Sequence, residues 1–91
     1  MQKRKWKVEL SKEALKYLKK QEKKAALRIL SRLDELEETP SPFAHKDVRP
    51  LTGKLRGFYR LRVAGVRIIF ELDKADKRIG VHHIITYMHL L

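Results

Sequence analysis

The residues best suited to chemistry are Arg60, Arg62 and Arg67, which are spaced so that a β-hairpin would bring them together. Side chains alternate between the two faces of a strand, so Arg60 and Arg62 would point away from the face that carries Leu61. The Ala-Gly pair at positions 64–65 suits a tight turn, after which Arg67 would lie on the same side as the other two arginines. Guanidinium groups present planar forks of N–H donors that match phosphate oxygens. The segment therefore predicts a rigid phosphate-binding face for a nucleic-acid backbone, with solvated surface cations as the alternative.

Further basic residues are expected to border this face, on the preceding loop and at the start of the strand. They are Lys46, Arg49, Lys54 and Arg56. Contacts from such side chains to nucleic-acid phosphates add affinity while carrying little sequence information. We predict that these residues bind the nucleic-acid backbone, and a solvated surface charge is the alternative for each.

The overall charge agrees with a polyanionic partner. The 91 residues hold 22 Lys and Arg against 11 Asp and Glu, which gives a formal net charge of +11. Such an excess accelerates association with polyanions and destabilises the isolated fold through self-repulsion. A solvated basic surface, with some lysine enrichment for thermal stability, is the alternative explanation. We favour a nucleic acid or an acidic protein as the partner of a single domain that spans residues 1–91.

The composition disfavours several other classes of protein. The chain contains no cysteine, which excludes disulfides and cysteine-based zinc sites. His82 and His83 are adjacent on a predicted strand, so they are expected to face opposite sides and not to share a metal ion. No apolar run approaches the ~18 residues of a membrane span. We therefore predict a cytoplasmic protein with no metal, no cofactor and no membrane partner.

A phosphate-cleaving site would also need a group that transfers protons. Arginine stays protonated and cannot act as the base at ordinary pH. Imidazole titrates near neutrality, which makes His89, His83 and His45 candidates. Tyr87 could support the nucleophile or stack on a base, and a core or sheet-edge aromatic residue is the alternative.

The hydrophobic patterns predict the element order β-α-α-β-β-β. Strict alternation indicates strands, apolar residues three or four apart indicate helices, and Ser11 is placed to cap the first helix. Helices packed on one face of a small, mainly antiparallel sheet would leave the arginines on the other face, in an α+β fold. The predicted elements are strands Lys5–Leu10, Lys54–Val63, Val66–Asp73 and Arg78–Tyr87, helices Lys12–Lys20 and Lys23–Glu38, and a loop Ser41–Thr52.

The second predicted helix ends in an acidic run, Asp34–Glu38. Negative charge at the carboxyl end of a helix opposes the helix macrodipole. We therefore expect some other contact to fix this end of the helix.

These features together resemble the RelE/ParE superfamily of toxins from bacterial and archaeal toxin–antitoxin modules. Family members share a K-L-x-G stretch, a basic alternating strand, and a strand in which Y-R-x-x precedes an aromatic residue. The resemblance covers nearly the whole chain, and the residues that carry it are Lys54-Leu-Arg-Gly57, Tyr59-Arg-Leu-Arg62, Gly65 and Val66-Arg-Ile-Ile-Phe70.

The resemblance implies a small toxin that acts on translation. RelE-like members enter the ribosomal A site and cut messenger RNA, where the 2′-OH attacks the adjacent phosphate and leaves a cyclic phosphate. By this resemblance Arg60 and Arg62 bind and orient the scissile phosphate, and Arg67 stabilises charge in the transition state. The implied partners are the ribosome with its mRNA and a cognate, acidic antitoxin that wraps the toxin. An antitoxin helix could lie in the groove of the helical hairpin.

The C-terminal segment departs from the RelE-like pattern. Chains of that type end the last strand with a Gly, a basic residue, an Arg and, a few residues later, a Tyr. Here the position of the arginine falls at Tyr87 and that of the tyrosine at Leu91. Tyr87 and His89 could take these roles in a shifted alignment, and both join the arginines in the candidate catalytic set.

Two alternatives stay open at this point. ParE-like members share the fold but inhibit DNA gyrase, and a toxin of that type would perform no chemistry of its own. A catalytically silent toxin that only binds its antitoxin is the second alternative, which the unusual segment Thr86–Leu91 favours.

Overall fold

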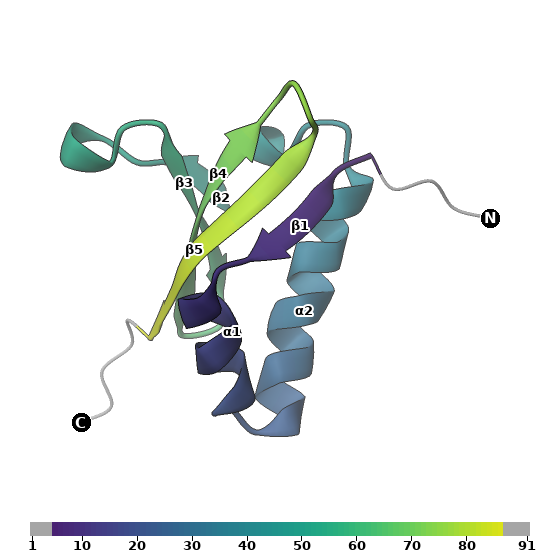
Figure 1. Cartoon of the computed structure of the whole chain (residues 1–91), viewed down its shortest axis with the longest axis vertical. Coiled ribbons are helices and arrows are strands. Elements are labelled where there is room, and N and C mark those ends of the chain that lie inside the picture. Colours follow the sequence, from purple (N-terminus) through teal and green to yellow (C-terminus); the bar gives the residue numbers. More distant parts are fainter. Residues whose placement is uncertain (1–4, 87–91) are drawn as a thin grey trace.

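A five-stranded sheet with the strand order β1-β5-β4-β3-β2 forms the centre of the structure. The structure is a computed structural model that describes residues 5–86, and Figure 1 shows α1 and α2 as a hairpin that lies beside the sheet. The elements are β1 (Lys7–Leu10), α1 (Lys12–Lys19), α2 (Lys23–Glu38), β2 (Val48–Pro50), β3 (Phe58–Val63), β4 (Val66–Asp73) and β5 (Arg78–Thr86), with 3-10 turns at Pro42–Ala44 and Gly53–Leu55.

The predicted α+β fold is confirmed, and so is the place of the first strand beside the meander. Strand β1 pairs in parallel with β5, whereas β2, β3, β4 and β5 pair antiparallel with their neighbours. A parallel pair needs a long crossover connection. The two helices begin that connection between β1 and the rest of the sheet.

The segment predicted as a loop over Ser41–Thr52 contains an additional strand, β2, so the prediction was wrong there. Its three residues pair with β3, with Arg49 opposite Arg60 and Pro50 opposite Tyr59. A three-residue strand that ends in proline shows no alternating pattern, and proline is tolerated at the edge of a sheet. Tertiary pairing with β3 therefore decides its conformation.

The other boundaries differ from the prediction at the ends of elements. Strand β3 begins at Phe58 and not at Lys54, because the preceding residues include the 3-10 turn Gly53–Leu55 and two glycines with positive φ, Gly53 at 66° and Gly57 at 99°. Strand β1 begins at Lys7, and α1 ends one residue earlier than expected. The described part of β5 ends at Thr86, and Tyr87 lies outside the described residues.

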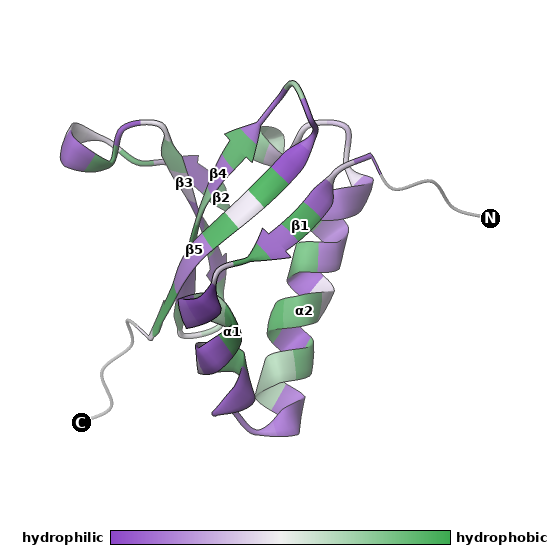
Figure 2. Cartoon of the chain, in the orientation of Figure 1, coloured by the Kyte–Doolittle hydropathy of each residue, from purple (hydrophilic) through white to green (hydrophobic). Residues whose placement is uncertain are grey.

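The hydrophobic core lies between the helices and one face of the sheet. Apolar and hydrophilic bands follow one another along α2 and β5 in Figure 2, as expected for elements with one buried side. The fully buried members of the core include Leu33 and Leu36 from α2, and Leu61, Ile68, Phe70 and Ile79 from the strands. No helix within residues 5–86 is both long and apolar enough to span a membrane.

The junction between β1 and α1 is held to β5 by Ser11. Its Oγ accepts a hydrogen bond from the N–H of Ala14 at 3.0 Å, which caps the helix as predicted. The same hydroxyl donates to the carbonyl of His82 at 2.7 Å, and the N–H of Ser11 donates to the carbonyl of Val81 at 2.9 Å. One residue therefore ends β1, starts α1 and attaches both to β5.

The acidic end of α2 is fixed by Glu37, which is the contact that the sequence required. The carbonyl of Glu37 accepts the N–H groups of Lys5 and Trp6 at 2.9 Å each, and its carboxylate accepts the N–H of Val8 at 2.8 Å. Glu37 is buried, with 9% of its surface exposed. Hydrogen bonds to a buried carboxylate are stronger than hydrogen bonds between neutral groups. They offset the unfavourable interaction of the Glu37 charge with the helix macrodipole at the carboxyl end of α2.

We predict that Glu37→Ala lowers the free energy of unfolding by about 2 kcal/mol, because the N–H of Val8 loses its charged acceptor inside the protein. Chemical denaturation followed by circular dichroism measures this change. The neighbouring Glu38→Ala removes an exposed carboxylate and should alter stability by less than about 0.5 kcal/mol. Equal effects of the two substitutions would contradict the assignment.

Candidate phosphate-binding site

The three arginines lie together on the face of the sheet opposite the core. Arg62 and Arg67 are direct partners across β3 and β4, and Arg60 is two residues from Arg62 on the same face. Side chains of directly opposed residues have Cβ atoms about 4.5–5.5 Å apart. The prediction that the three arginines share one face is thus confirmed, and they lie on two paired strands.

A small pocket opens between this cluster and the edge strand β2. Its volume is about 130 Å³. It is lined by Lys46, Asp47, Arg49, Arg60 and Arg62. Four cations around one opening provide the charge and the N–H donors that a phosphate group requires.

Arg67 is the member of the cluster that lies on β4, and it does not line the pocket itself. Its Nε atom is shielded from solvent. Nε is the atom through which the guanidinium joins the rest of the side chain, so its burial restricts the orientation of the guanidinium. A fixed orientation suits the stabilisation of a negative charge at one place.

Arg49 is partly engaged with its own strand. Its Nη1 donates to the carbonyl of Lys46 at 3.1 Å and to the carbonyl of Val48 at 2.9 Å. These bonds hold the guanidinium beside the pocket that Arg49 lines.

The loop that forms the pocket wall is anchored through His45. The Nδ1 atom of His45 accepts the N–H of Asp47 at 3.1 Å, so the proton is on Nε2, which donates to the carboxylate of Glu35 on α2 at 3.1 Å. Asp47 is held further by Arg32 of α2 at 3.5 Å, and its carbonyl accepts the N–H of Arg62 at 3.1 Å. The pocket wall is therefore fastened to α2 on one side and to β3 on the other.

The two remaining predicted RNA-binding residues lie elsewhere. Lys54 belongs to the 3-10 turn Gly53–Leu55 and Arg56 follows it, and both are exposed. This turn extends away from the sheet before the start of β3 in Figure 1. Neither residue lines the pocket, so a contact with RNA would be made at a distance from the arginine cluster.

Tyr87 and His89, which complete the candidate catalytic set, lie outside the described residues. Their role stays a prediction.

The expectation that His82 and His83 face opposite sides was wrong. The pairing of β4 with β5 shifts by one residue, so that Ile69 is opposite His83 whereas Phe70 is opposite Val81. A bulge of this kind places two consecutive residues against one on the partner strand. Both histidines therefore lie on the open face but diverge, His82 toward Glu71 at 3.0 Å and His83 toward Glu13 at 3.7 Å. No cluster of His, Asp and Glu within residues 5–86 could hold a metal ion.

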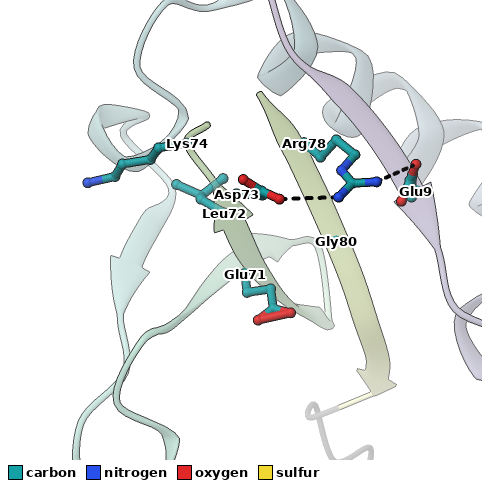
Figure 3. A pocket seen from close by; sticks show the side chains of 7 residues that line it. All are labelled: Glu9, Glu71, Leu72, Asp73, Lys74, Arg78 and Gly80. Atoms are coloured by element: carbon teal, nitrogen blue, oxygen red, sulfur yellow. Dashed lines mark hydrogen bonds and ion pairs between the residues drawn. The ribbon is translucent and has the colours of Figure 1, made fainter. Parts of the chain in front are cut away.

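The opposite end of the open face is acidic. Figure 3 shows Glu9, Asp73 and Arg78 converging there, with ion-pair distances from Arg78 of 3.7 Å to Glu9 and 3.2 Å to Asp73. Asp76 lies 3.3 Å from the same guanidinium. The N–H of Asp76 and the Arg78 side chain lower the pKa of Asp73, and the carboxylates raise the pKa of Arg78. The open face thus has a cationic end and an anionic end.

Comparison with known proteins decides the family. Residues 8–86 match the family described as "ParE toxin of type II toxin-antitoxin system, parDE". The chain belongs to this family. This match confirms the resemblance of the toxin to the RelE/ParE superfamily that its residues indicated.

Solved structures share the fold of the toxin. The archaeal RelE–RelB complex from Pyrococcus horikoshii gives a TM-score of 0.76 at 28% identity, over 94% of this chain and 99% of that chain. The RelBE2 complex from Mycobacterium tuberculosis gives 0.78 at 15% identity, over 93% and 94%. The isolated RelE toxin of E. coli gives 0.73 at 16% identity, over 93% and 87%. The comparison with curated proteins gives no match.

We predict that His45→Ala destabilises the toxin by about 1–2 kcal/mol, because the N–H of Asp47 and the Glu35 carboxylate lose their shared partner. His45→Asn offers an Oδ1 acceptor near the position of Nδ1 and should recover part of this loss. Thermal unfolding monitored by circular dichroism compares the three proteins. The same loss in both variants would show that the bond to Asp47 contributes nothing.

We predict that Asp73→Asn destabilises the toxin at neutral pH and that the difference disappears in acid. The lowered pKa means that the folded state favours the charged carboxylate. This contribution is complete above about pH 4, and it is lost as the pH falls through the lowered pKa of the folded state. Urea unfolding across this range measures it. A difference that persists at the lowest pH would indicate a packing effect.

Proposed function

We propose that the toxin is a ribosome-dependent endonuclease that cuts messenger RNA in the A site. The observation that supports this is the group of arginines on paired strands, Arg60, Arg62 and Arg67, beside a pocket of phosphate size. Like charges opposed across strands lower the stability of a sheet. The opposed arginines in a small domain of net charge +11 are therefore better explained by the binding of a polyanion than by a contribution to the stability of the fold.

The proposed reaction is an internal transfer of the phosphoryl group. The 2′-oxygen of one nucleotide attacks the adjacent phosphorus, the bond to the 5′-oxygen of the next nucleotide breaks, and a 2′,3′-cyclic phosphate forms. Arg60 and Arg62 hold the non-bridging oxygens, while Arg67 stabilises the negative charge that builds up in the transition state. The base takes the proton from the 2′-OH, and the acid gives a proton to the leaving 5′-oxygen.

Proton transfer is assigned to Tyr87 and His89 as the candidates from the sequence. The pocket adds a third group, because the carboxylate of Asp47 lines it together with the arginines. A carboxylate at this position could accept the proton of the 2′-OH. Its ion pair with Arg32 would keep it oriented.

We propose a cognate, acidic antitoxin as the physiological partner, in the cytoplasm. The solved relatives from P. horikoshii and M. tuberculosis are themselves toxin–antitoxin complexes. The helical hairpin of this toxin exposes leucines that an amphipathic segment could cover, with exposed fractions of 43% at Leu15, 54% at Leu27 and 38% at Leu30. The net charge of +11 would steer an acidic segment to the toxin.

Inhibition of DNA gyrase is the second candidate function. The observation in its favour is that the matching family is that of ParE toxins. In this case the arginines would contact protein or DNA, and the toxin would catalyse no reaction. A supercoiling assay with purified gyrase tests this candidate directly.

We predict that Arg67→Ala lowers the rate of mRNA cleavage on programmed ribosomes by about 10²–10³-fold, because one charge-stabilising group is removed from the transition state. The matched control is Arg28→Ala, which removes an exposed cation from α2 and should leave the rate unchanged. Circular dichroism verifies that both variants fold.

Cleavage by both variants at the rate of the parent would remove Arg67 from the mechanism. The endonuclease proposal fails if the parent itself does not cut. In that case inhibition of supercoiling would establish the gyrase function, and its absence would indicate a silent toxin.

A further inference from the structure

An aromatic ridge crosses the open face of the sheet beside the arginines. Phe58 from β3 and His82 from β5 lean toward each other over β4, with ring centroids 5.2 Å apart and an angle of 72° between the ring planes. Gly80 is opposite Glu71 on the open face, so alternation along β5 places His82 on this face too, and the bulge then brings His83 onto the same face. A phenylalanine on the solvent side of a small sheet is not required by the core, which lies on the other face.

A carboxylate adjoins the ridge. Glu71 is directly opposite Phe58 across β3 and β4, and its Oε1 lies 3.0 Å from Nε2 of His82. Figure 3 shows the Glu71 carboxylate apart from the cluster formed by Arg78, Asp73 and Glu9. About half of the Glu71 side chain, 51%, is exposed. Glu71 therefore keeps acceptor positions that face solvent.

The space beside the ridge is hollow. A pocket of about 280 Å³ is bordered by His82 and Glu71 and extends over Gly80 toward the end of β1. Gly80 has no side chain to fill this space, and a methyl group added at its Cα would meet the Glu71 side chain at 3.6 Å, in ordinary van der Waals contact. A planar group lying on the ridge could place its edge here.

The ridge stands at a suitable distance from the arginines. Phe58 precedes Arg60 by two residues on the same face, a separation of about 6.6–6.8 Å along a strand. Proteins that hold single-stranded RNA combine cations along the backbone with aromatic rings on which bases stack. The open face offers both, in adjacent rows of the same rigid sheet.

We propose that Phe58 and His82 form a nucleobase subsite next to the phosphate-binding arginines, and that Glu71 selects bases with an exocyclic amino group. A carboxylate accepts hydrogen bonds from the amino groups of adenine, cytosine or guanine. Uracil presents carbonyl oxygens in their place, which a carboxylate repels. The subsite thus takes an unpaired RNA base and discriminates against uracil.

This inference rests on the proposed function, since it names a further part of the RNA site. The charge of the toxin makes binding to any RNA backbone expected at low salt. Short single-stranded oligonucleotides of adenosine, cytidine or uridine, and an abasic ribose-phosphate oligonucleotide of the same length, therefore separate backbone binding from base binding. Fluorescence anisotropy with labelled oligonucleotides measures each dissociation constant.

We expect the parent toxin to bind the adenosine and cytidine oligonucleotides about tenfold more tightly than the abasic one, in the range of one stacked base, and more tightly than the uridine oligonucleotide. Phe58→Leu should reduce their affinity to that of the abasic oligonucleotide, whereas Phe58→Tyr should retain it. Glu71→Gln should abolish the discrimination against uridine relative to adenosine and cytidine. Thermal unfolding verifies that each variant folds.

The matched control is Arg60→Gln, which should weaken all four oligonucleotides alike and reduce the dependence on salt. Equal affinity of the parent for intact and abasic RNA would overturn the nucleobase subsite while leaving the arginine site in place. Unchanged discrimination in Glu71→Gln would overturn the role of the carboxylate. Failure to bind RNA of any kind at low salt would overturn both this inference and the proposed function.

Discussion

The buried contact between Glu37 and β1 is the constraint on which the arrangement of the sheet depends. Glu37, at the carboxyl end of α2, accepts hydrogen bonds from three N–H groups, which belong to β1 and to the residues just before it. These hydrogen bonds stabilise the negative charge at a helix end where the macrodipole alone would oppose it. Once β1 is held there, it pairs in parallel with β5, which becomes a central strand. The helices then cover one face, and the other face stays open to carry charge.

The open face combines rigidity with a separation of charge. Its arginines stand on paired strands, where backbone hydrogen bonds determine their spacing before any ligand arrives. The wall of the pocket is attached to α2 by the bonds of His45 and Asp47, so the same helix that organises β1 also supports the candidate phosphate site. At the far end, Arg78 compensates a group of carboxylates that would otherwise repel an anionic ligand. The aromatic pair of Phe58 and His82 lies between the cationic end and the anionic end of the open face.

Much of this arrangement follows from local patterns. The two-residue period of β3 and β4 places Arg60, Arg62 and Arg67 on one face whatever the strands pack against, and the helices follow from their apolar spacing. Strand β2 could not be anticipated, because three residues ending in Pro50 have no period, and pairing with β3 defines them. That His83 shares the open face with His82 could not be predicted for a related reason. A bulge is set by the register between strands, and alternation along one strand does not reveal it.

The two lateral edges of the sheet also determine how the toxin can meet other chains. At β1, the outward N–H groups of Trp6 and Val8 are taken by Glu37. At β2, Pro50 has no N–H, and the guanidinium of Arg49 covers the carbonyl of Val48. Exposed strand edges are templates for aggregation, and at both of these strands the protein's own groups occupy outward backbone positions. Edge-to-edge pairing of one copy of the toxin with another is thereby disfavoured at β1 and at β2.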